Sequence, residues 1–287
     1  MVRPSYTYYP GCTAKTSSKE FEISTLMVCE KLGIDLVELE DWNCCGASSA
    51  HTVSPLVGLA LPARDLQVAE RMGKPVVTGC AMCWHRLKYA VHELSDKRKL
   101  AQVNEVLGKE YRNSVKVEHF LQIFAAHSDL LTPRLALTGL KVASYYGCVL
   151  VRPKAVMALD DEDNPQLMDN IIRQLGAEAV DWDLKTSCCG ASLPLAHPEA
   201  VVKLSHQVLK QARASGANCV AVACPMCHSN LDTRQKAIKS EYPDFEKMPI
   251  YYFTQLMGLS LGFSPEEMHI DKHLTDGLYL LREKGLN

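Results

Sequence analysis

The chain has 287 residues, of which 47% are hydrophobic and 22% charged, and its formal net charge is −2. This is the composition of an ordinary globular protein, and a charge so close to zero favours no polyanionic partner such as a nucleic acid. No run of about 18 apolar residues is present, which argues against a membrane span, and the first residues lack the apolar stretch of a secretory signal. We therefore expect a cytoplasmic protein, in which thiols stay reduced.

Short strand-like segments alternate with helical periodicity along the first half of the chain. The expected strands are 5–9, 34–39 and 76–78, and the expected helices are 21–32, 55–72 and one long helix from about 82 towards 107. We predict a first domain at 1–110, a linker region at 111–139 and a second domain at 140–287.

The second half repeats the same order of elements. The expected strands are 142–146, a short one near 179 and 219–223, and the expected helices are 167–175, 199–214 and one after Cys227. A strand and a helix beyond Pro249 close this domain, and a polar tail is expected from Ser264. Strands that alternate with helices predict an α/β fold with a parallel sheet in each half, in which sites lie at the ends of strands.

Ten of the twelve cysteines fall into two sets with the same arrangement. Each set has a single cysteine, an adjacent pair and, 34 residues later, a C-x-x-C motif. Cys-Cys-Gly-Ala-Ser follows in both halves, at 44–48 and at 188–192. The chain is therefore an internal duplication, with eight extra residues in the second half around 159–165. The two sets are Cys12, Cys44, Cys45, Cys80 and Cys83, and Cys148, Cys188, Cys189, Cys224 and Cys227.

The spacing of these cysteines favours metal ligation over disulfides, because adjacent cysteines bridge poorly to each other and a reducing compartment opposes disulfides. A zinc site and a cubane iron–sulfur cluster each take four ligands, whereas each half offers five. Soft thiolates in this number favour an iron–sulfur assembly, and a zinc-bound scaffold remains the alternative. Cys29 and Cys219 have no counterpart in the repeat, so we expect them to be small buried residues.

This twofold pattern of a single cysteine, Cys-Cys-Gly and C-x-x-C resembles the CCG-domain family. Over nearly its full length, the chain is similar to the B subunits of heterodisulfide reductases. The resemblance implies two CCG domains related by pseudo-symmetry, and two noncubane 4Fe–4S clusters, each held by one set of five cysteines. It also implies reductive cleavage of a disulfide, either that of coenzyme M and coenzyme B or a related small one. The implied partners are the ferredoxin-like C subunit and the flavin-containing A subunit of such complexes.

Two clusters suit this reaction, because a disulfide takes two electrons and each cluster can supply one. An anionic thiol substrate needs nearby cations, and Lys15, Arg152 and Lys154 follow the first cysteine of each set. Solvated surface charge is an equally good interpretation of these three residues. No side chain beyond the clusters is assigned a catalytic role, since His85 and His228 are not equivalent in the repeat. The functional alternative is an electron-relay or quinone-linked iron–sulfur subunit of another oxidoreductase complex.

Overall fold

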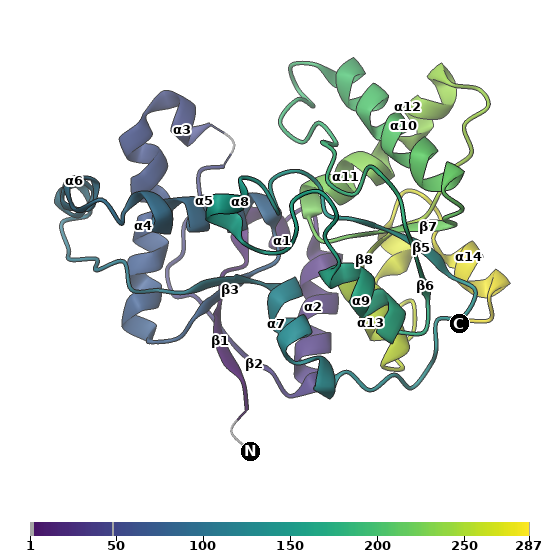
Figure 1. Cartoon of the computed structure of the whole chain (residues 1–287), viewed down its shortest axis with the longest axis horizontal. Helices are drawn as coiled ribbons and strands as arrows, with labels where there is room; N and C mark the ends of the chain where they lie inside the picture. Colours follow the sequence, from purple (N-terminus) through teal and green to yellow (C-terminus); the bar gives the residue numbers. More distant parts are fainter. Residues whose placement is uncertain (1–2, 48, 287) are drawn as a thin grey trace.

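Each half of the chain is built around a parallel sheet, and the two sheets have the same topology. The computed structural model describes residues 3–47 and 49–286, so Ser48 of the first Cys-Cys-Gly-Ala-Ser segment lies outside the described residues. The strand orders are β2-β1-β3-β4 and β6-β5-β7-β8. The two halves lie side by side in Figure 1, with α1, α5, α8 and α11 in the middle of the view. The predicted α/β fold with two repeats is confirmed.

The first half contains the elements that the hydrophobic pattern predicts, with a few differences given below. Helix α2 ends at Gly33, which has a φ of +69°, and α4 begins with Ser54, whose hydroxyl accepts a hydrogen bond from the Val57 amide. The elements are β1 (Ser5–Tyr8), α1 (Gly11–Ala14), α2 (Lys19–Leu32), β2 (Asp35–Glu38), α3 (Ala50–Val53), α4 (Pro55–Met72), β3 (Val76–Thr78), α5 (Ala81–Glu93), α6 (Lys97–Leu107), β4 (Val117–His119), α7 (Phe120–Ala126) and the 3-10 turn η1 (Ser128–Leu130).

The second half follows the same plan, and its central strand β7 is buried along its whole length. Such a run of apolar residues is typical of a strand covered on both faces by helices. The elements are β5 (Lys141–Tyr145), α8 (Lys154–Met157), α9 (Leu167–Gln174), β6 (Glu178–Val180), α10 (Pro198–Ala214), β7 (Cys219–Val222), α11 (Pro225–Thr233), α12 (Gln235–Glu241), β8 (Ile250–Tyr252), α13 (Phe253–Ser260), η2 (Ile270–Lys272) and α14 (Leu278–Glu283).

The region 111–139, for which the sequence predicted no strand or helix, contains β4 and α7. Strand β4 pairs in parallel with β3 and is the fourth strand of the first sheet. Its counterpart in the second half is β8, and the repeat is visible in the sequence as His-Phe-Leu-Gln at 119–122 and Tyr-Phe-Thr-Gln at 252–255. In both segments the glutamine side chain accepts a hydrogen bond from the backbone amide three residues earlier, at 3.0 and 2.9 Å. The domain boundaries proposed above remain a prediction.

The expectation of one long helix from about 82 to 107 is wrong. The structure has two helices, α5 and α6, separated by a turn at 94–96. The carboxylate of Asp96 accepts hydrogen bonds from the backbone amides of Arg98 and Lys99, at 2.8 and 3.4 Å. An aspartate in this position satisfies the free amides of a new helix start, so the chain begins a second helix instead of continuing the first.

The expected polar tail from Ser264 is also wrong. Residues Met268, Ile270 and Leu281 are buried in the core of the second half. The side-chain amide of Gln255 donates a hydrogen bond to the Met268 carbonyl at 2.9 Å, which fixes this segment against α13. The polar residues that suggested a tail are those on the outer side of a folded segment. Among the described residues, no helix combines the length and the apolar character needed to cross a membrane.

Helices α2 and α13 form much of the contact between the two halves. The hydroxyls of Ser24 and Thr254 are buried and hydrogen-bonded at 2.8 Å, and the rings of Phe21 and Tyr252 stack with centroids 4.4 Å apart. On the side of the cysteine motifs, the indole of Trp84 donates a hydrogen bond to the Leu150 carbonyl at 3.2 Å. Buried polar and aromatic contacts of this kind fix the orientation of the two halves more precisely than apolar packing alone.

A buried ion pair fixes the strand ends of the second half. The ammonium of Lys185 lies 2.9 Å from a carboxylate oxygen of Asp169, and both side chains are at most 1% exposed. The other carboxylate oxygen accepts a hydrogen bond from the Tyr146 hydroxyl at 2.8 Å. The backbone carbonyl of Lys185 accepts from the amides of Tyr146 and Gly147. The pair thus links α9, the segment after β6 and the loop that carries Cys148.

Removing the charge of Asp169 is expected to destabilise the fold strongly. Asp169→Asn leaves the ammonium of Lys185 buried without its carboxylate, which should lower the free energy of unfolding by about 3 kcal/mol or more. The control is Glu178→Gln, which breaks a pair with Lys141 whose side chains are 52% and 60% exposed, and should cost about 1 kcal/mol or less. Urea unfolding followed by circular dichroism measures both. Equal shifts in the two variants would contradict this role for Asp169.

Candidate metal centres

The cysteines of each set come together because three strand ends meet at one edge of each sheet. In the first half, Cys12 follows β1, the adjacent pair follows β2, and Cys80 follows β3. Strand β1 lies between β2 and β3. The connection from β1 to β2 therefore runs to one side of β1, and the next connection, from β2, crosses back to β3 on the other side. Open parallel sheets place their binding sites at such a point, outside the carboxyl ends of the strands. The second half has the same arrangement at β5, β6 and β7.

Each set has an inner, buried part and an outer part. The distance between sulfurs is 3.5 Å for Cys45 and Cys83 and 3.6 Å for Cys189 and Cys227. These near-identical distances show that the duplication extends to the geometry of the thiols. All twelve cysteines of the chain are free thiols. The buried members are Cys45, Cys80, Cys83, Cys189, Cys224 and Cys227, Cys148 is partly exposed, and the exposed members are Cys12, Cys44 and Cys188.

Glycine is required where the first cysteine of each set approaches the C-x-x-C motif. Gly11 and Gly147 have φ angles of +70° and +69°. A Cβ atom on Gly11 would lie 2.9 Å from the sulfur of Cys83, and one on Gly147 would lie 3.0 Å from the sulfur of Cys227. Only glycine adopts this backbone conformation freely and leaves the sulfur its space. The glycine before each first cysteine therefore keeps room at the centre of the set.

Two buried tyrosines anchor the loops that carry the adjacent pairs. The hydroxyl of Tyr9 donates a hydrogen bond to the carbonyl of Asn43, at 2.7 Å, directly before Cys44. The hydroxyl of Tyr145 donates in the same way to the carbonyl of Ser187, at 2.5 Å, directly before Cys188. The hydroxyls of these two tyrosines therefore hold the two pair-carrying loops in equivalent positions.

Each set has at least one thiol in a position that favours its thiolate, and in the second set Cys224 has a lowered pKa as well as Cys188. Hydrogen bonds from Cys44 and Cys83 lower the pKa of Cys45 to about 3. In the second set, a hydrogen bond from Cys148 lowers the pKa of Cys188 to about 6. Thiolates are the form that binds metal, so these surroundings suit ligation.

The two sets meet where the halves touch. Cys80 and Cys224, one from each set, lie close together across the interface, and the proximity of Cys224 raises the pKa of Cys80. Both residues directly precede a helix start, at α5 and α11. The positive ends of these two helices therefore point at the meeting of the two sets, where they stabilise negative charge on sulfur.

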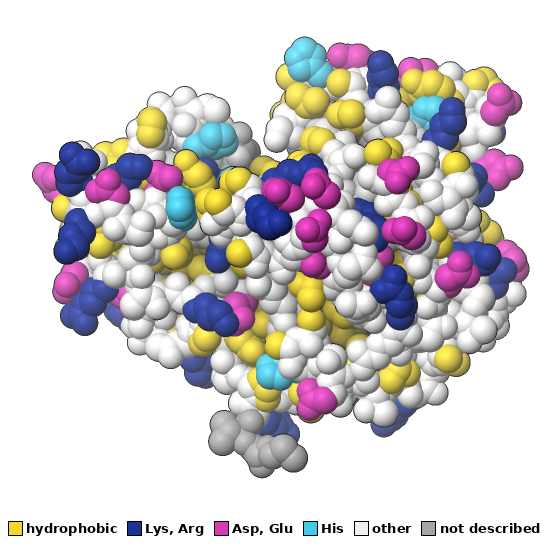
Figure 2. Space-filling model, in the orientation of Figure 1, with side chains coloured by type: hydrophobic (Ala, Val, Ile, Leu, Met, Phe, Trp, Pro, Cys, Tyr) yellow, Lys and Arg dark blue, Asp and Glu magenta, His cyan; other side chains and the backbone are white. Residues whose placement is uncertain are grey.

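A cavity of about 660 Å³ is lined by residues that lie near cysteines of both sets in the sequence. Besides His85 and Arg86, four of its lining residues lie within three positions of a cysteine of the sets: Ala47, Met82, Val149 and Ser192. The first two belong to the first half and the other two to the second, so the cavity borders both sets. Figure 2 shows a notch between the α3 end of the first half and the α10–α12 region of the second. The other lining residues are His51, Thr52, Pro55, Leu59, His85, Arg86, Tyr89, Glu93 and Lys99.

The three cations proposed from the sequence do not line this cavity. Lys15 pairs with Glu22 and Glu38, both at 2.8 Å. Arg152 and Lys154 lie near acidic residues of the eight-residue insertion, at 2.9 Å from Asp163 and 3.9 Å from Asp161. Their role in binding a substrate remains a prediction.

The basic and imidazole groups that the cavity contains are instead His51, His85, Arg86 and Lys99. Sequence reasoning considered His85 and missed the other three. Arg86 could have been found, because it lies three residues after the first C-x-x-C motif, on the same turn of α5 as the ligands. His51 and Lys99 carry no such signal, since they come from α3 and α6, which only the fold brings to the cavity.

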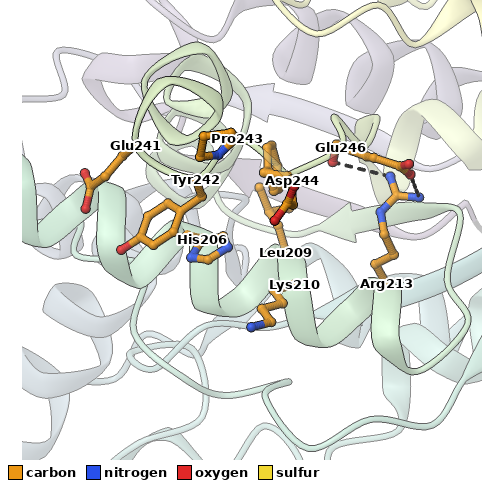
Figure 3. Close-up of a pocket in the computed structure, with 10 residues that line it drawn as sticks. His206, Leu209, Lys210, Arg213, Glu241, Tyr242, Pro243, Asp244 and Glu246 are labelled. Carbon is orange, nitrogen blue, oxygen red and sulfur yellow. Dashed lines mark hydrogen bonds and ion pairs between the residues drawn. The ribbon is translucent and has the colours of Figure 1, made fainter.

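The remaining singled-out residues have structural surroundings. Cys29 and Cys219 are buried in the hydrophobic core, as expected, and burial raises the pKa of both thiols. His228 is buried and stacks on Tyr252, with ring centroids 4.2 Å apart. A second hollow, of about 330 Å³, lies on the outer face of α10 and α12, where His206 stacks on Tyr242 (Figure 3). No cysteine lines that hollow, so it is separate from the two sets.

The donors present fit an iron–sulfur cluster in both halves. Within the described residues, no three His, Cys, Asp or Glu side chains converge on a single metal ion. Each set nevertheless offers five soft sulfur donors, and its glycine leaves space beside one of the C-x-x-C sulfurs, which suits the chemistry that iron–sulfur clusters use. Near the first set, the Nε atom of Arg86 is buried without a hydrogen-bond partner. A buried cationic group without a partner fits a site that receives negative charge.

Comparison with known proteins identifies the family. A family model for the CCG cysteine-rich domain matches twice, at residues 6–88 and 142–232. The chain belongs to the CCG family. The two matched segments contain all ten cysteines of the two sets. The resemblance noted from the cysteine pattern is thus confirmed.

Relatives in the CCG family match this chain over almost its whole length. The chain is 32% identical to the 8-methylmenaquinol:fumarate reductase membrane anchor subunit of Wolinella succinogenes, covering 97% of this chain and 100% of the relative. It is 30% identical to the B subunit of the ferredoxin/F420H2-dependent CoB-CoM heterodisulfide reductase of Methanosarcina acetivorans, covering 95% and 94%. A solved structure of a hypothetical protein from Helicobacter pylori shares the fold, with a TM-score of 0.76 and 12% identity, over 96% of this chain and 53% of that chain.

Replacing Gly11 is expected to disturb the first set specifically. Gly11→Ala places a methyl group 2.9 Å from the sulfur of Cys83 and should lower the iron bound by purified protein. Gly33→Ala is the matched control, because Gly33 has almost the same φ of +69° but no atom within 4 Å of its Cβ position. It should cost only the backbone strain, about 1–2 kcal/mol, and keep its iron. Equal iron loss in both variants would show that backbone strain, and not the close contact with the Cys83 sulfur, causes the loss.

Proposed function

We propose that this chain is the iron–sulfur catalytic subunit of a heterodisulfide reductase-type complex, which cleaves a disulfide reductively to two thiols. The observation that carries the proposal is that two equivalent cysteine sets approach each other at Cys80 and Cys224, and a cavity is lined by residues next to cysteines of both sets. The substrate is the disulfide of coenzyme M and coenzyme B or a related low-molecular-weight disulfide. Membership of the CCG family and the relative named as the B subunit of a heterodisulfide reductase support this assignment.

Each set would hold one noncubane 4Fe–4S cluster through its five cysteines. Together, the two bound clusters would supply the two electrons that the cleavage of one disulfide requires. The overall reaction is R–S–S–R′ + 2 e⁻ + 2 H⁺ → R–SH + R′–SH. The protein contributes the fixed positions of the sulfurs, through Gly11 and Gly147 and through the hydrogen bonds of Tyr9 and Tyr145.

The cavity suits a small anionic disulfide. Arg86 and Lys99 bring two positive charges to its wall and Glu93 brings one negative charge, so its fixed charge is positive. The imidazoles of His51 and His85 lie on the same wall and can donate hydrogen bonds or a proton to a departing thiolate.

Electrons would reach this chain through other members of a complex. A ferredoxin-like C subunit would deliver them, and a flavin-containing A subunit would supply them. The heterodisulfide reductase relatives are themselves named as subunits, which supports an assembly of this kind. We propose a cytoplasmic location for the assembly.

A second candidate function is that of an electron-relay or quinone-linked iron–sulfur protein within another oxidoreductase complex. The relative from Wolinella succinogenes, named as the membrane anchor of an 8-methylmenaquinol:fumarate reductase, matches at 32% identity over its entire length and favours this alternative. Both functions use the same cysteine sets. They differ in what occupies the cavity, which is a disulfide in the first case and no sulfur compound in the second.

Metal analysis of variants tests the assignment of the ligands. Anaerobically purified protein should contain about eight iron atoms with as much acid-labile sulfide. Cys45→Ser and Cys189→Ser should each lose about half of this iron, because each removes a buried ligand of one set. Cys29→Ser and Cys219→Ser are the controls, since these buried cysteines lie outside both sets and should keep the iron content. Zinc in place of iron, or iron loss in the controls alone, would contradict the ligand sets.

Binding of a thiol separates the two candidate functions. A disulfide reductase should show an electron paramagnetic resonance signal that appears only when the oxidised protein is mixed with a thiol such as coenzyme M. Val149→Trp, which narrows the cavity beside Cys148, should weaken this signal at least tenfold and keep the iron content. A full iron content with a spectrum that no thiol changes would support the relay function instead.

A further inference from the structure

The two cysteine sets differ in one buried residue at an equivalent position. Three residues after the C-x-x-C motif, the first half has Arg86 and the second half has Asn230. Both positions lie on the helix that the motif begins, α5 or α11, and both side chains are buried, with exposed fractions of 7% and 2%. At this position the duplicated chain therefore carries a positive charge in one half and a neutral amide in the other.

Arg86 has unusual surroundings for a buried arginine. Its Nη2 atom donates a hydrogen bond to the carbonyl of Gly58, and its Nε atom has no partner. None of the ion pairs in the described part of the chain includes Arg86. Gly58 gives the guanidinium its space, because a Cβ atom there would lie 3.2 Å from Nη2. The guanidinium also lies over the Tyr89 ring, 5.6 Å from its centroid, and a positive charge with so few polar partners favours an anion nearby.

Asn230 shows which anion the equivalent position faces. Its side-chain amide donates to the carbonyl of Cys189 at 3.0 Å and lies 3.7 Å from the Cys189 sulfur. Cys189 is the buried member of the second adjacent pair, and Cys45 is its counterpart. The positive charge of Arg86 acts on Cys45 and is among the causes that lower its pKa, after the hydrogen bonds from Cys44 and Cys83. Arg86 and Asn230 thus each act on the inner cysteine of the adjacent pair in their own half, which is Cys45 or Cys189.

Other buried charges near the two sets do not cancel this difference. In the second half, the ammonium of Lys185 is balanced by Asp169 at 2.9 Å. In the first half, burial raises the pKa of Asp65 and the charge of Cys45 raises it further, so a negative charge on this carboxyl is disfavoured beside the first set. The first set therefore has a net positive charge beside it that the second set lacks. A nearby positive charge stabilises the reduced, more negative state of a redox centre, and does so more strongly in a buried site.

We propose that Arg86 makes the two centres unequal, so that the first centre has the higher reduction potential and receives an electron before the second. The inference rests on the proposed function only in requiring an iron–sulfur centre at each set. Arg86 does not bind iron. It acts indirectly, through the effect of its positive charge on the neighbouring ligand Cys45. Because the two reduction potentials differ, the first centre is reduced before the second.

The test is a redox titration, followed by electron paramagnetic resonance, of the full chain with no thiol or disulfide present. Arg86→Asn copies the residue of the second half into the first. It should shift the midpoint potential of one centre to a more negative value, by the equivalent of a tenfold change in the reduction equilibrium or more, which is about 59 mV for one electron. Arg86→Lys keeps the charge and should keep most of the potential. The Cys189→Ser protein, which retains the first set, identifies the centre that shifts.

Arg98→Asn is the matched control, because it removes the same charge from a side chain that is 93% exposed on α6. It should leave both potentials unchanged. An Arg86→Asn protein with full iron and two unchanged midpoints would overturn the inference and leave the proposed function intact. If Arg86→Asn loses its iron, the titration is repeated with Arg86→Gln, and loss of iron in both would also overturn it, since the charge would then serve assembly. Wild-type protein without iron would instead refute the proposed function.

Discussion

The approach of Cys80 to Cys224 brings together two sites that are more than 140 residues apart in the chain. It is possible because each thiol lies at the carboxyl end of an equivalent strand, β3 or β7, directly before a helix. The contacts between α2 and α13 and the bond from Trp84 to Leu150 hold the two halves in the orientation that this meeting requires. Two centres in such contact can act on one small molecule, whereas a single half could not.

Burial is what makes the two sets chemically distinctive. Five thiols in one place repel each other when ionised, and neighbouring thiols together with burial raise the pKa of Cys83 and Cys227. A metal cluster relieves this repulsion by neutralising the thiolates, so its binding free energy also stabilises the fold. Helix starts at α5 and α11, the glycines before the first cysteines and the charge of Arg86 all favour negative charge at the sulfurs. The two halves differ mainly in how much positive charge lies beside the sulfurs, because Arg86 of the first half is replaced by Asn230 in the second.

The sequence predicted the two cysteine sets, the strands that carry them and the parallel packing, because the equal spacing of 34 residues leaves little freedom for the fold of each half. It did not reveal β4, since a three-residue strand gives almost no periodic signal, although the repeated Phe-x-Gln after it marks the place. The break between α5 and α6 depends on one side chain, Asp96. The cavity was missed because residues from α3, α5 and α6 line it, and only the fold brings these together.

The proposed chemistry depends on two iron centres lying on either side of the contact between Cys80 and Cys224. A crystal structure of the anaerobically purified protein, with diffraction recorded on both sides of the iron absorption edge, tests this most directly. We predict two separate iron peaks per chain, one within reach of Cys45 and Cys83 and one within reach of Cys189 and Cys227. A single iron peak, or peaks that follow the zinc edge instead, would contradict this arrangement.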